Sequence, residues 1–250
     1  MLYCSIIYFV RVIRLKERLD KIITGAGISS RSEVKKLIRA GRVTVDGETV
    51  LDPESKIDRD GSEVRVDGEK INTARFRYFM MNKPAGVLSV TEDRAQKTVL
   101  DLLSERDRKL GLFPVGRLDK DTEGLLLLTN DGDFSHRIIS PASKISKVYY
   151  AVVDGIPDEK DADAFSRGIV LKDGTECLPA ELVPAGGGTC FVTVYEGKYH
   201  QVKRMLASRG KPVTALKRLS VGGLSLPDEL ESGCYRELLA DELCKIFNGN

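Results

Sequence analysis

The segment from Gly116 to Gly132, GRLDKDTEGLLLLTNDG, decides the fold of this chain. Its continuous apolar run, Leu125 to Leu128, has the length of a strand that is buried on both faces, and a turn of Asn, Asp and Gly closes it. Gly116 and Gly124 allow the backbone to bend on either side of Asp119. The sequence therefore predicts a carboxylate at the entrance of a rigid core, where it either stabilises a turn or takes part in catalysis.

The chain is long enough for one good core and a small second domain. Its 250 residues are 42% hydrophobic and 30% charged, with a net charge of +2. The charge is unevenly distributed, because residues 11–42 hold ten Lys or Arg against three acidic residues, and residues 195–220 hold seven against one. Phosphates are bound chiefly through Lys and Arg, so these basic blocks predict a polyanionic partner, with solvated helix faces as the alternative.

Cysteine and histidine usage bears on the compartment and on metal binding. The five cysteines are scattered without a Cys-x-x-Cys pair, and there are two histidines, so we expect reduced cysteines and no metal site. Residues 2–10 are apolar but too short to cross a bilayer, and basic residues follow them instead of preceding them as in a signal peptide. We therefore expect a cytoplasmic protein with no membrane partner, and we interpret residues 1–14 as an N-terminal extension.

Residues 15–68 have the pattern of a small α/β module. Apolar spacing predicts a helix over residues 18–24, and Ser30 with Glu33 forms a capping box for a second helix that ends at Gly41. An Asp-Gly pair at residues 46–47, between two β-branched runs, predicts a tight hairpin. Basic residues lie largely on the outer face of the second helix. The predicted RNA-binding residues are Arg31, Lys35, Lys36, Arg39, Arg42 and, in a later turn, Lys83.

Residues 69–75 are polar and lack periodicity, so we interpret them as a linker to a second domain, residues 76–250. Strand patterns at residues 77–82, 147–153 and 190–195 alternate with helical patterns in this domain. The second domain is therefore expected to combine strands and helices.

Four segments resemble the pseudouridine synthases that act on ribosomal RNA, and specifically the small-subunit (RsuA) family. They are the segment quoted first, YFMMNKPAG at residues 78–86, the Lys-x-Tyr triplet at residues 147–149, and EGKYHQVKRML at residues 196–206. Residues 18–47 are similar to the RNA-binding module of a small-subunit ribosomal protein. The resemblance implies an α+β fold, in which a small N-terminal α/β RNA-binding module precedes a catalytic domain with a mixed, mainly antiparallel sheet flanked by helices.

The resemblance also implies roles for individual residues. It assigns Asp119 as the essential catalytic residue, Tyr149 to the target base, and Lys203 as the basic partner of Asp119. Many relatives have Arg where this chain has Lys203, so whether Lys203 or Arg204 makes the contact stays open. We expect that cation to keep Asp119 ionised. The implied substrate-binding residues are Arg117, Lys147, His200, Gln201 and Arg204.

The predicted function is the conversion of a specific uridine in small-subunit (16S) ribosomal RNA to pseudouridine by a monomeric enzyme. The reaction has no redox step, so we expect no cofactor; the partner is ribosomal RNA or an assembly intermediate of the ribosomal subunit. Whether Asp119 attacks the sugar, adds to the base or assists an elimination stays open. The alternatives are a large-subunit target, an inactive RNA-binding or ribosome-assembly protein, and a metal-dependent nuclease that uses Asp119, Asp121, Asp131 and Asp133.

Overall fold

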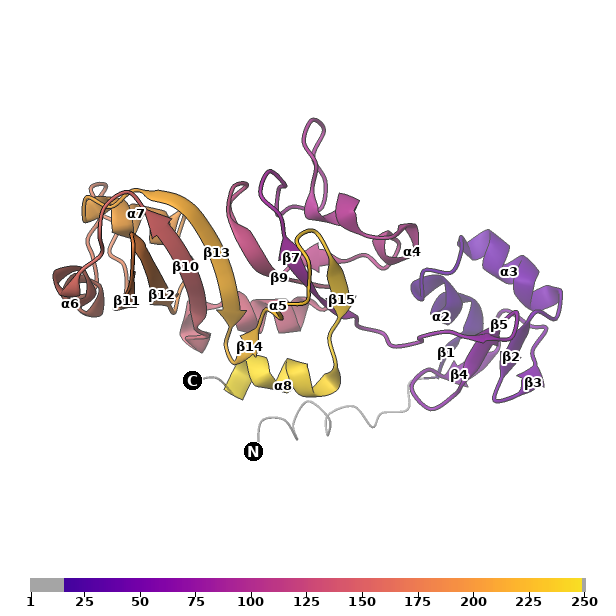
Figure 1. Ribbon diagram of the computed structural model, residues 1–250. Coiled ribbons are helices and arrows are strands. Elements are labelled where there is room, and N and C mark those ends of the chain that lie inside the picture. The colour runs from indigo at the N-terminus through magenta and orange to yellow at the C-terminus, as the bar shows by residue number, and fades with distance from the viewer. Residues whose placement is uncertain (1–15, 249–250) are drawn as a thin grey trace. The chain divides into compact units, whose positions relative to one another are not determined.

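The structure, a computed structural model, describes residues 16–248 (Figure 1). The predicted N-terminal extension lies outside the described residues. The described chain divides into two units, one with residues 16–77 and 103–112, and the other with residues 78–102 and 113–248. The expected α+β fold, with a small N-terminal module and a larger domain, is confirmed.

The smaller unit packs two helices, α2 (Leu19–Gly25) and α3 (Arg31–Arg39), against short strands. The predicted capping box is present, because the Ser30 side chain accepts a hydrogen bond from the Glu33 N–H and the Glu33 carboxylate accepts one from the Ser30 N–H. The predicted hairpin joins β2 (Val43–Val45) to β3 (Glu48–Thr49). Both of its turn residues, Asp46 and Gly47, have positive φ, as a tight hairpin turn requires.

This unit extends further along the chain than predicted. Ile71 is only 6% exposed and packs in the core with residues of α2 and α3. The predicted boundary at residue 68 is therefore too early, because the strand at residues 69–70 is polar and exposed and shows no apolar alternation. Its further elements are β1 (Lys16–Arg18), β4 (Lys56–Asp58), β5 (Val64–Val66), β6 (Glu69–Lys70) and α4 (Glu105–Arg108).

The larger unit is built on one mixed sheet, which has nine strands within the described residues. The strand order is β11-β12-β10-β13-β9-β7-β15, with β8 beside β9 and β14 beside β13. β13 and β9 run parallel and the other neighbouring pairs are antiparallel. The strands are β7 (Tyr78–Lys83), β8 (Phe113–Pro114), β9 (Glu123–Thr129), β10 (Lys147–Val153), β11 (Glu181–Gly186), β12 (Thr189–Val194), β13 (Val213–Val221), β14 (Leu224–Ser225) and β15 (Tyr235–Glu237).

Helices flank this sheet, as expected. Phe134 and Ile138 of α5 and Ile246 of α8 share one core cluster with Leu125 and Leu127 of β9, so both helices cover the same face of that strand. The helical segments of the unit are η1 (Val99–Leu102), α5 (Gly132–Ile139), η2 (Pro141–Ser143), α6 (Glu159–Arg167), α7 (Gln201–Ser208) and α8 (Ala240–Asn248).

Strand β9 is the buried strand that the leucine run predicts. Its four leucines, Leu125–Leu128, are at most 1% exposed, and burying each contributes about 1.5–3 kcal/mol. Gly124 has a φ of 99°, and a Cβ there would lie 2.2 Å from the Arg218 carbonyl oxygen. Only glycine therefore allows β9 to approach β13 this closely, directly after the loop that carries Asp119.

Composition led to expectations about the cysteines and about membranes. Cys177, Cys190 and Cys234 are free thiols, whereas Cys244 is disulfide-bonded, so the expectation of reduced cysteines is wrong for Cys244. Scattered spacing does not determine cysteine pairing, which is why the sequence missed it. No helix within residues 16–248 has both the length and the apolarity needed to span a membrane.

Candidate active site

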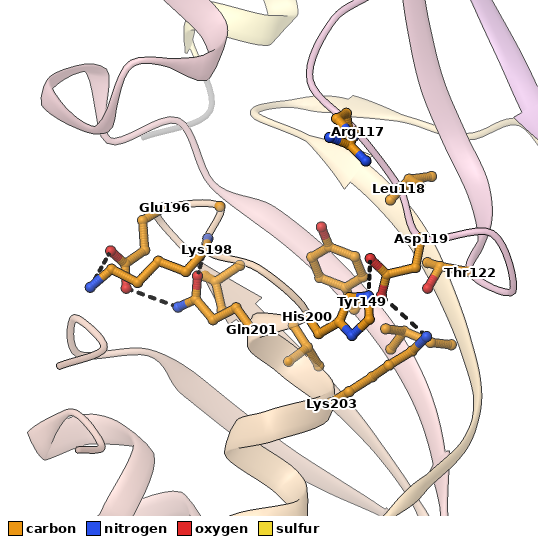
Figure 2. A pocket seen from close by; sticks show the side chains of 14 residues that line it. Arg117, Leu118, Asp119, Thr122, Tyr149, Glu196, Lys198, His200, Gln201 and Lys203 are labelled. Atoms are coloured by element: carbon orange, nitrogen blue, oxygen red, sulfur yellow. Dashed lines mark hydrogen bonds and ion pairs between the residues drawn. The ribbon is translucent and has the colours of Figure 1, made fainter. Parts of the chain in front are cut away.

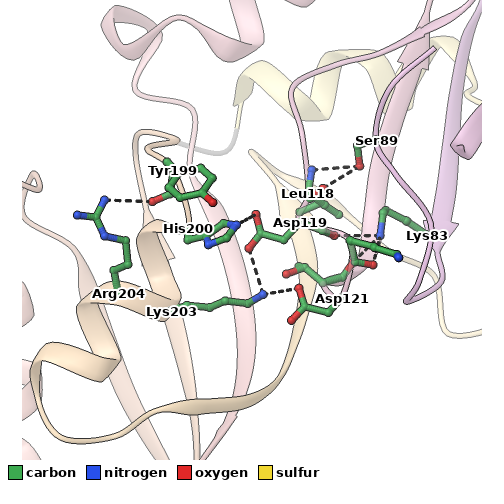
Figure 3. Close-up of polar contacts among 11 residues, drawn as sticks. Lys83, Ser89, Leu118, Asp119, Asp121, Tyr199, His200, Lys203 and Arg204 are labelled. Carbon is green, nitrogen blue, oxygen red and sulfur yellow. Dashed lines mark hydrogen bonds and ion pairs between the residues drawn. The ribbon is translucent and has the colours of Figure 1, made fainter. Parts of the chain in front are cut away.

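The loop that carries Asp119 is anchored by a buried lysine (Figure 3). Lys83, the last residue of β7, has no exposed surface. Its Nζ donates to the carbonyl oxygens of Pro84, Asp119, Lys120 and Thr122 at 2.9–3.2 Å. Burial lowers the pKa of this ammonium group to about 8. The prediction that Lys83 contacts RNA is therefore wrong. Lys83 still belongs to β7, and its ammonium group is buried and hydrogen-bonded to carbonyl groups of the protein.

Two further residues, Gly86 and Ser89, hold the same loop. The Gly86 N–H donates to the Lys120 carbonyl at 2.7 Å. The Ser89 hydroxyl donates to the Leu118 carbonyl and accepts from the Leu118 N–H, at 3.0 and 3.2 Å. The position of Asp119 is thus fixed by the chain that follows β7 as well as by β9.

Two side chains approach the Asp119 carboxylate (Figure 2). Lys203 Nζ lies 3.1 Å from Asp119 Oδ2, and His200 Nε2 lies 3.4 Å from Asp119 Oδ1. Lys203 Nζ also lies 2.5 Å from Asp121 Oδ1. Burial lowers the pKa of Lys203, but its hydrogen bonds to Asp121 and Asp119 outweigh burial and raise that pKa overall. One charged ammonium therefore joins two carboxylates.

The neighbouring cation, Arg204, points elsewhere. Its guanidinium lies 2.5 Å from Asp173 Oδ2 and donates to the Tyr199 carbonyl (Figure 3). Successive residues on a helix are about 100° apart, so Lys203 and Arg204 of α7 face different neighbours. Of the two candidates that the sequence left open, the structure places Lys203 against Asp119.

His200 reaches Asp119 from an uncommon backbone conformation. It precedes α7 with a φ of 48°, in the left-handed region, which is uncommon for residues other than glycine. Its imidazole ring stacks on the exposed Tyr199 ring, with centroids 3.8 Å apart. Strained residues of this kind cluster at functional sites, and this one directs a polar ring at the predicted catalytic carboxylate.

A pocket with a volume of about 650 Å³ opens beside Asp119, and a smaller one of about 70 Å³ adjoins it. Asp119, Tyr149, His200 and Arg117 line both, and Lys147 lines the larger one. Figure 2 shows the Tyr149 ring beside Asp119 and His200. The predicted catalytic residues therefore meet at one hollow, although they come from three distant segments.

Gln201 lines the smaller pocket, but both ends of its amide are occupied. Its Nε2 donates to Glu196 at 2.9 Å, and its Oε1 accepts from the Lys198 N–H at 3.0 Å. Gln201 therefore holds the turn before α7, and does not present a free amide to a substrate as the resemblance implied.

The remaining predicted RNA-binding residues lie in the smaller unit. The buried Asp20 carboxylate pairs with Arg31 at 3.3 Å and lies 4.0 Å from Lys35, and Arg42 pairs with Asp67 at 2.5 Å. Lys36 and Arg39 are exposed on α3. Four of these five basic residues belong to α3 and Arg42 directly precedes β2, and three of the five also support the fold of the unit.

Sequence reasoning missed Arg218. This residue of β13 is 3% exposed, lines the larger pocket, and donates from Nε to the Leu125 carbonyl at 2.7 Å. The signal that could have found it is the apolar Leu216, two residues earlier on the same face of a strand. When a basic residue occupies a strand position whose neighbours on the same face point into the protein, it lies either at the edge of the core or in a binding site.

The four acids of the nuclease alternative do not converge. Asp119 and Asp121 precede β9, whereas Asp131 follows it, where it caps α5 and accepts a hydrogen bond from the Tyr78 hydroxyl. In the part of the chain that the structure describes, no group of three or more His, Cys, Asp or Glu side chains is arranged to hold a metal ion. The described residues therefore provide no metal-binding site for the nuclease alternative.

Comparison with known proteins identifies both units. The family model for RNA pseudouridylate synthases matches residues 77–208, and the S4 domain model matches residues 17–64. The chain is 44% identical over 230 residues to the uncharacterised RNA pseudouridine synthase YtzG of Bacillus subtilis, covering 90% of this chain and 96% of that protein. It is 38% identical over 231 residues to the ribosomal small subunit pseudouridine synthase A of Pseudomonas aeruginosa, covering 92% and 100%.

A solved structure agrees with these matches. A crystal structure of a pseudouridylate synthase superposes with a TM-score of 0.65 at 35% identity, over 92% of this chain and 99% of that one. The matched family segment contains Asp119, Tyr149 and Lys203, the residues that meet at the pocket. The chain therefore belongs to the family of RNA pseudouridylate synthases, with an S4 domain ahead of the synthase domain.

Proposed function

We propose that this enzyme converts a specific uridine of small-subunit ribosomal RNA to pseudouridine, with Asp119 as the catalytic carboxylate. The observation that carries the proposal is the meeting of Asp119, Lys203 and Tyr149 at one pocket. Because the loop around Asp119 is tied to a buried lysine and a buried strand, the carboxylate is held in a fixed position.

The reaction requires little from the protein beyond one carboxylate in the correct position. The bond between the ribose C1′ and the uracil N1 breaks, and a bond between C1′ and C5 forms. The hydrogen on C5 leaves as a proton and N1 takes up a proton, so nothing is oxidised or reduced. Asp119 serves by attacking C1′, by adding to the base, or by accepting a proton in an elimination that gives a glycal. In each route Lys203 pairs with the carboxylate and orients it.

The target base has to leave the RNA stack before it reaches Asp119, which costs on the order of a few kcal/mol. Tyr149 supports this step, because its ring lines the pocket and offers a face on which the extruded uracil stacks. We propose that its hydroxyl exchanges a proton with the base. Basic residues of the S4 domain supply affinity through RNA phosphates.

The names of the relatives favour a ribosomal target. The similar proteins of Pseudomonas aeruginosa and Vibrio cholerae are named ribosomal small subunit pseudouridine synthase A. We infer that the partner is ribosomal RNA or an assembly intermediate of the small subunit, and that the enzyme acts in the cytoplasm as a monomer without cofactor or metal. A large-subunit target and an inactive ribosome-assembly protein are the other candidates.

Tritium release separates these candidates. Small-subunit RNA labelled with tritium at C5 of uridine is incubated with the enzyme in the presence of EDTA, and both tritium in water and RNA length are measured. We expect one tritium released per RNA without strand scission. Binding without release from either ribosomal RNA would favour the inactive protein, and scission that EDTA abolishes would favour a nuclease. Sequencing pseudouridine in both ribosomal RNAs of a deletion strain then identifies the target, and a site lost from the large subunit would contradict the small-subunit assignment.

A further inference from the structure

Two cations in the larger pocket have no part in the chemistry proposed above. Lys147 and Tyr149 lie two residues apart on β10, and so on the same face, while Arg218 on β13 pairs directly with Tyr149. The register shifts between Val148 and Tyr149, which marks a bulge at this point of the sheet. All three side chains line the pocket of about 650 Å³.

Arg218 is buried without an acidic partner. Its Nε donates to the Leu125 carbonyl, and within residues 16–248 no carboxylate pairs with it. A guanidinium has five N–H donors, and the Leu125 carbonyl accepts the one on Nε. Burying a charge is costly unless it is paired and hydrogen-bonded. An arginine that is 3% exposed and faces a pocket therefore indicates a site for an anion.

Lys147 stands close to this arginine and is also without a carboxylate partner among the described residues. Its Nζ donates to the Ile145 carbonyl at 3.0 Å. Burial, and then the charge of Arg218, lower the pKa of Lys147 to about 8. Two neighbouring cations destabilise one another in this way when no anion lies between them.

The other charged residues that line the larger pocket are mostly positive as well. Arg117, Lys120 and Lys198 also line the larger pocket, and Asp119 is the one acidic residue among the described residues that do. Because the Asp119 carboxylate is already joined to Lys203, it does not neutralise Lys147 and Arg218. The pocket as a whole therefore attracts a negatively charged ligand.

We propose that Lys147 and Arg218 form a phosphate subsite, which binds the phosphodiester of the target nucleotide while the base stacks on Tyr149. Guanidinium and ammonium groups both form strong charge-assisted hydrogen bonds with phosphate oxygens. Such a contact fixes the ribose with respect to Asp119 and stabilises the nucleotide outside the RNA stack. The inference rests on the proposed function only in taking the ligand to be a nucleotide of RNA.

Binding of small nucleotides tests the subsite without turnover on RNA. The affinities of the full chain for uridine, 5′-uridine monophosphate and 3′-uridine monophosphate are measured by calorimetry. Charge-assisted hydrogen bonds to phosphate are worth about tenfold or more in affinity, so we expect one monophosphate to bind at least about tenfold more tightly than uridine. The monophosphate that does so shows whether the phosphate on the 5′ or the 3′ side occupies the subsite.

Lys147→Met should abolish this preference and leave the affinity for uridine unchanged. Lys217→Met is the matched control, because Lys217 precedes Arg218 on β13, pairs with Tyr150 and does not line the pocket. It should keep the preference. Equal affinity of the wild type for uridine and both monophosphates, or a preference that survives Lys147→Met, would overturn the subsite.

The two proposals fail separately. If the wild type releases tritium from RNA but Lys147→Met keeps the preference for a monophosphate, the function stands and the subsite is wrong. If Lys147→Met loses the preference but the wild type releases no tritium from any ribosomal RNA, the subsite stands as a nucleotide phosphate site and the proposed function fails.

Discussion

Replacing Lys203 by Met removes the ammonium group that joins two carboxylates. Its Nζ lies 3.1 Å from Asp119 Oδ2 and 2.5 Å from Asp121 Oδ1, and the side chains of Lys203 and Asp119 are 21% and 25% exposed. A hydrogen bond between charged groups contributes about 1.5–3 kcal/mol, and about 1.4 kcal/mol corresponds to a factor of ten in rate. If the contact orients Asp119 for the chemical step, the single-turnover rate should fall about 10- to 150-fold while RNA affinity changes little.

Single-turnover tritium release with enzyme in excess measures this step apart from RNA binding, which a filter-binding titration follows in parallel. Arg204→Met is the matched control, because it removes the adjacent cation of the same helix, whose partner is Asp173. Lys203→Arg should recover part of the rate, since it keeps the charge. An unchanged rate in Lys203→Met, or an equal loss in Arg204→Met, would refute the pairing with Asp119.

The other predictions concern the loop, the strand beside it, the pocket and the S4 domain. Lys83→Met leaves buried carbonyl groups unpaired, so calorimetry should show the synthase domain destabilised by about 3–5 kcal/mol. Lys120→Met, at an exposed position of the same loop, should change the free energy of unfolding by less than about 0.5 kcal/mol, and equal effects of the two variants would contradict the anchoring role. Gly124→Ala should lower thermal stability by at least about 3 kcal/mol, because its Cβ would meet a backbone oxygen at 2.2 Å; a near-wild-type melting temperature would show that β9 shifts at little cost. The pKa of Lys147 is about 8 in the free protein, so the affinity for a uridine monophosphate should fall as pH rises through 8 and the lysine loses its charge. Lys147→Met should remove this pH dependence, and a wild-type affinity that does not change with pH would exclude the lysine from binding. Deletion of residues 1–71 should weaken RNA binding and reduce its salt dependence in a titration, and unaltered affinity would leave the S4 domain without a role.

The parts of this protein that sequence predicted depend on local patterns. The leucine run of β9 carries its own signal, because a buried strand needs apolar residues on both faces. The capping box at Ser30 and the Asp-Gly hairpin are likewise set by residues a few positions apart. The pocket residues Asp119, Tyr149 and Lys203 came from motifs, and no periodicity in the sequence alone would have brought them together.

The parts that sequence did not predict depend on distant neighbours. Lys83 precedes a Pro-Gly turn, which is usually exposed, and its burial follows from carbonyl groups more than thirty residues away. Arg218 is buried because β13 runs beside β9 and places it under the Leu125 carbonyl. Lys203 and Arg204 are equivalent in sequence, and only the position of α7 relative to the loop distinguishes them.

The most direct test of the central claim is the single-turnover yield of pseudouridine from Asp119→Asn, measured beside its affinity for the same RNA. Because the amide keeps the shape of the side chain and removes its negative charge, we expect RNA affinity within about threefold of the wild type and no product above background. Product formed at the wild-type rate would contradict the claim that the Asp119 carboxylate carries out the reaction.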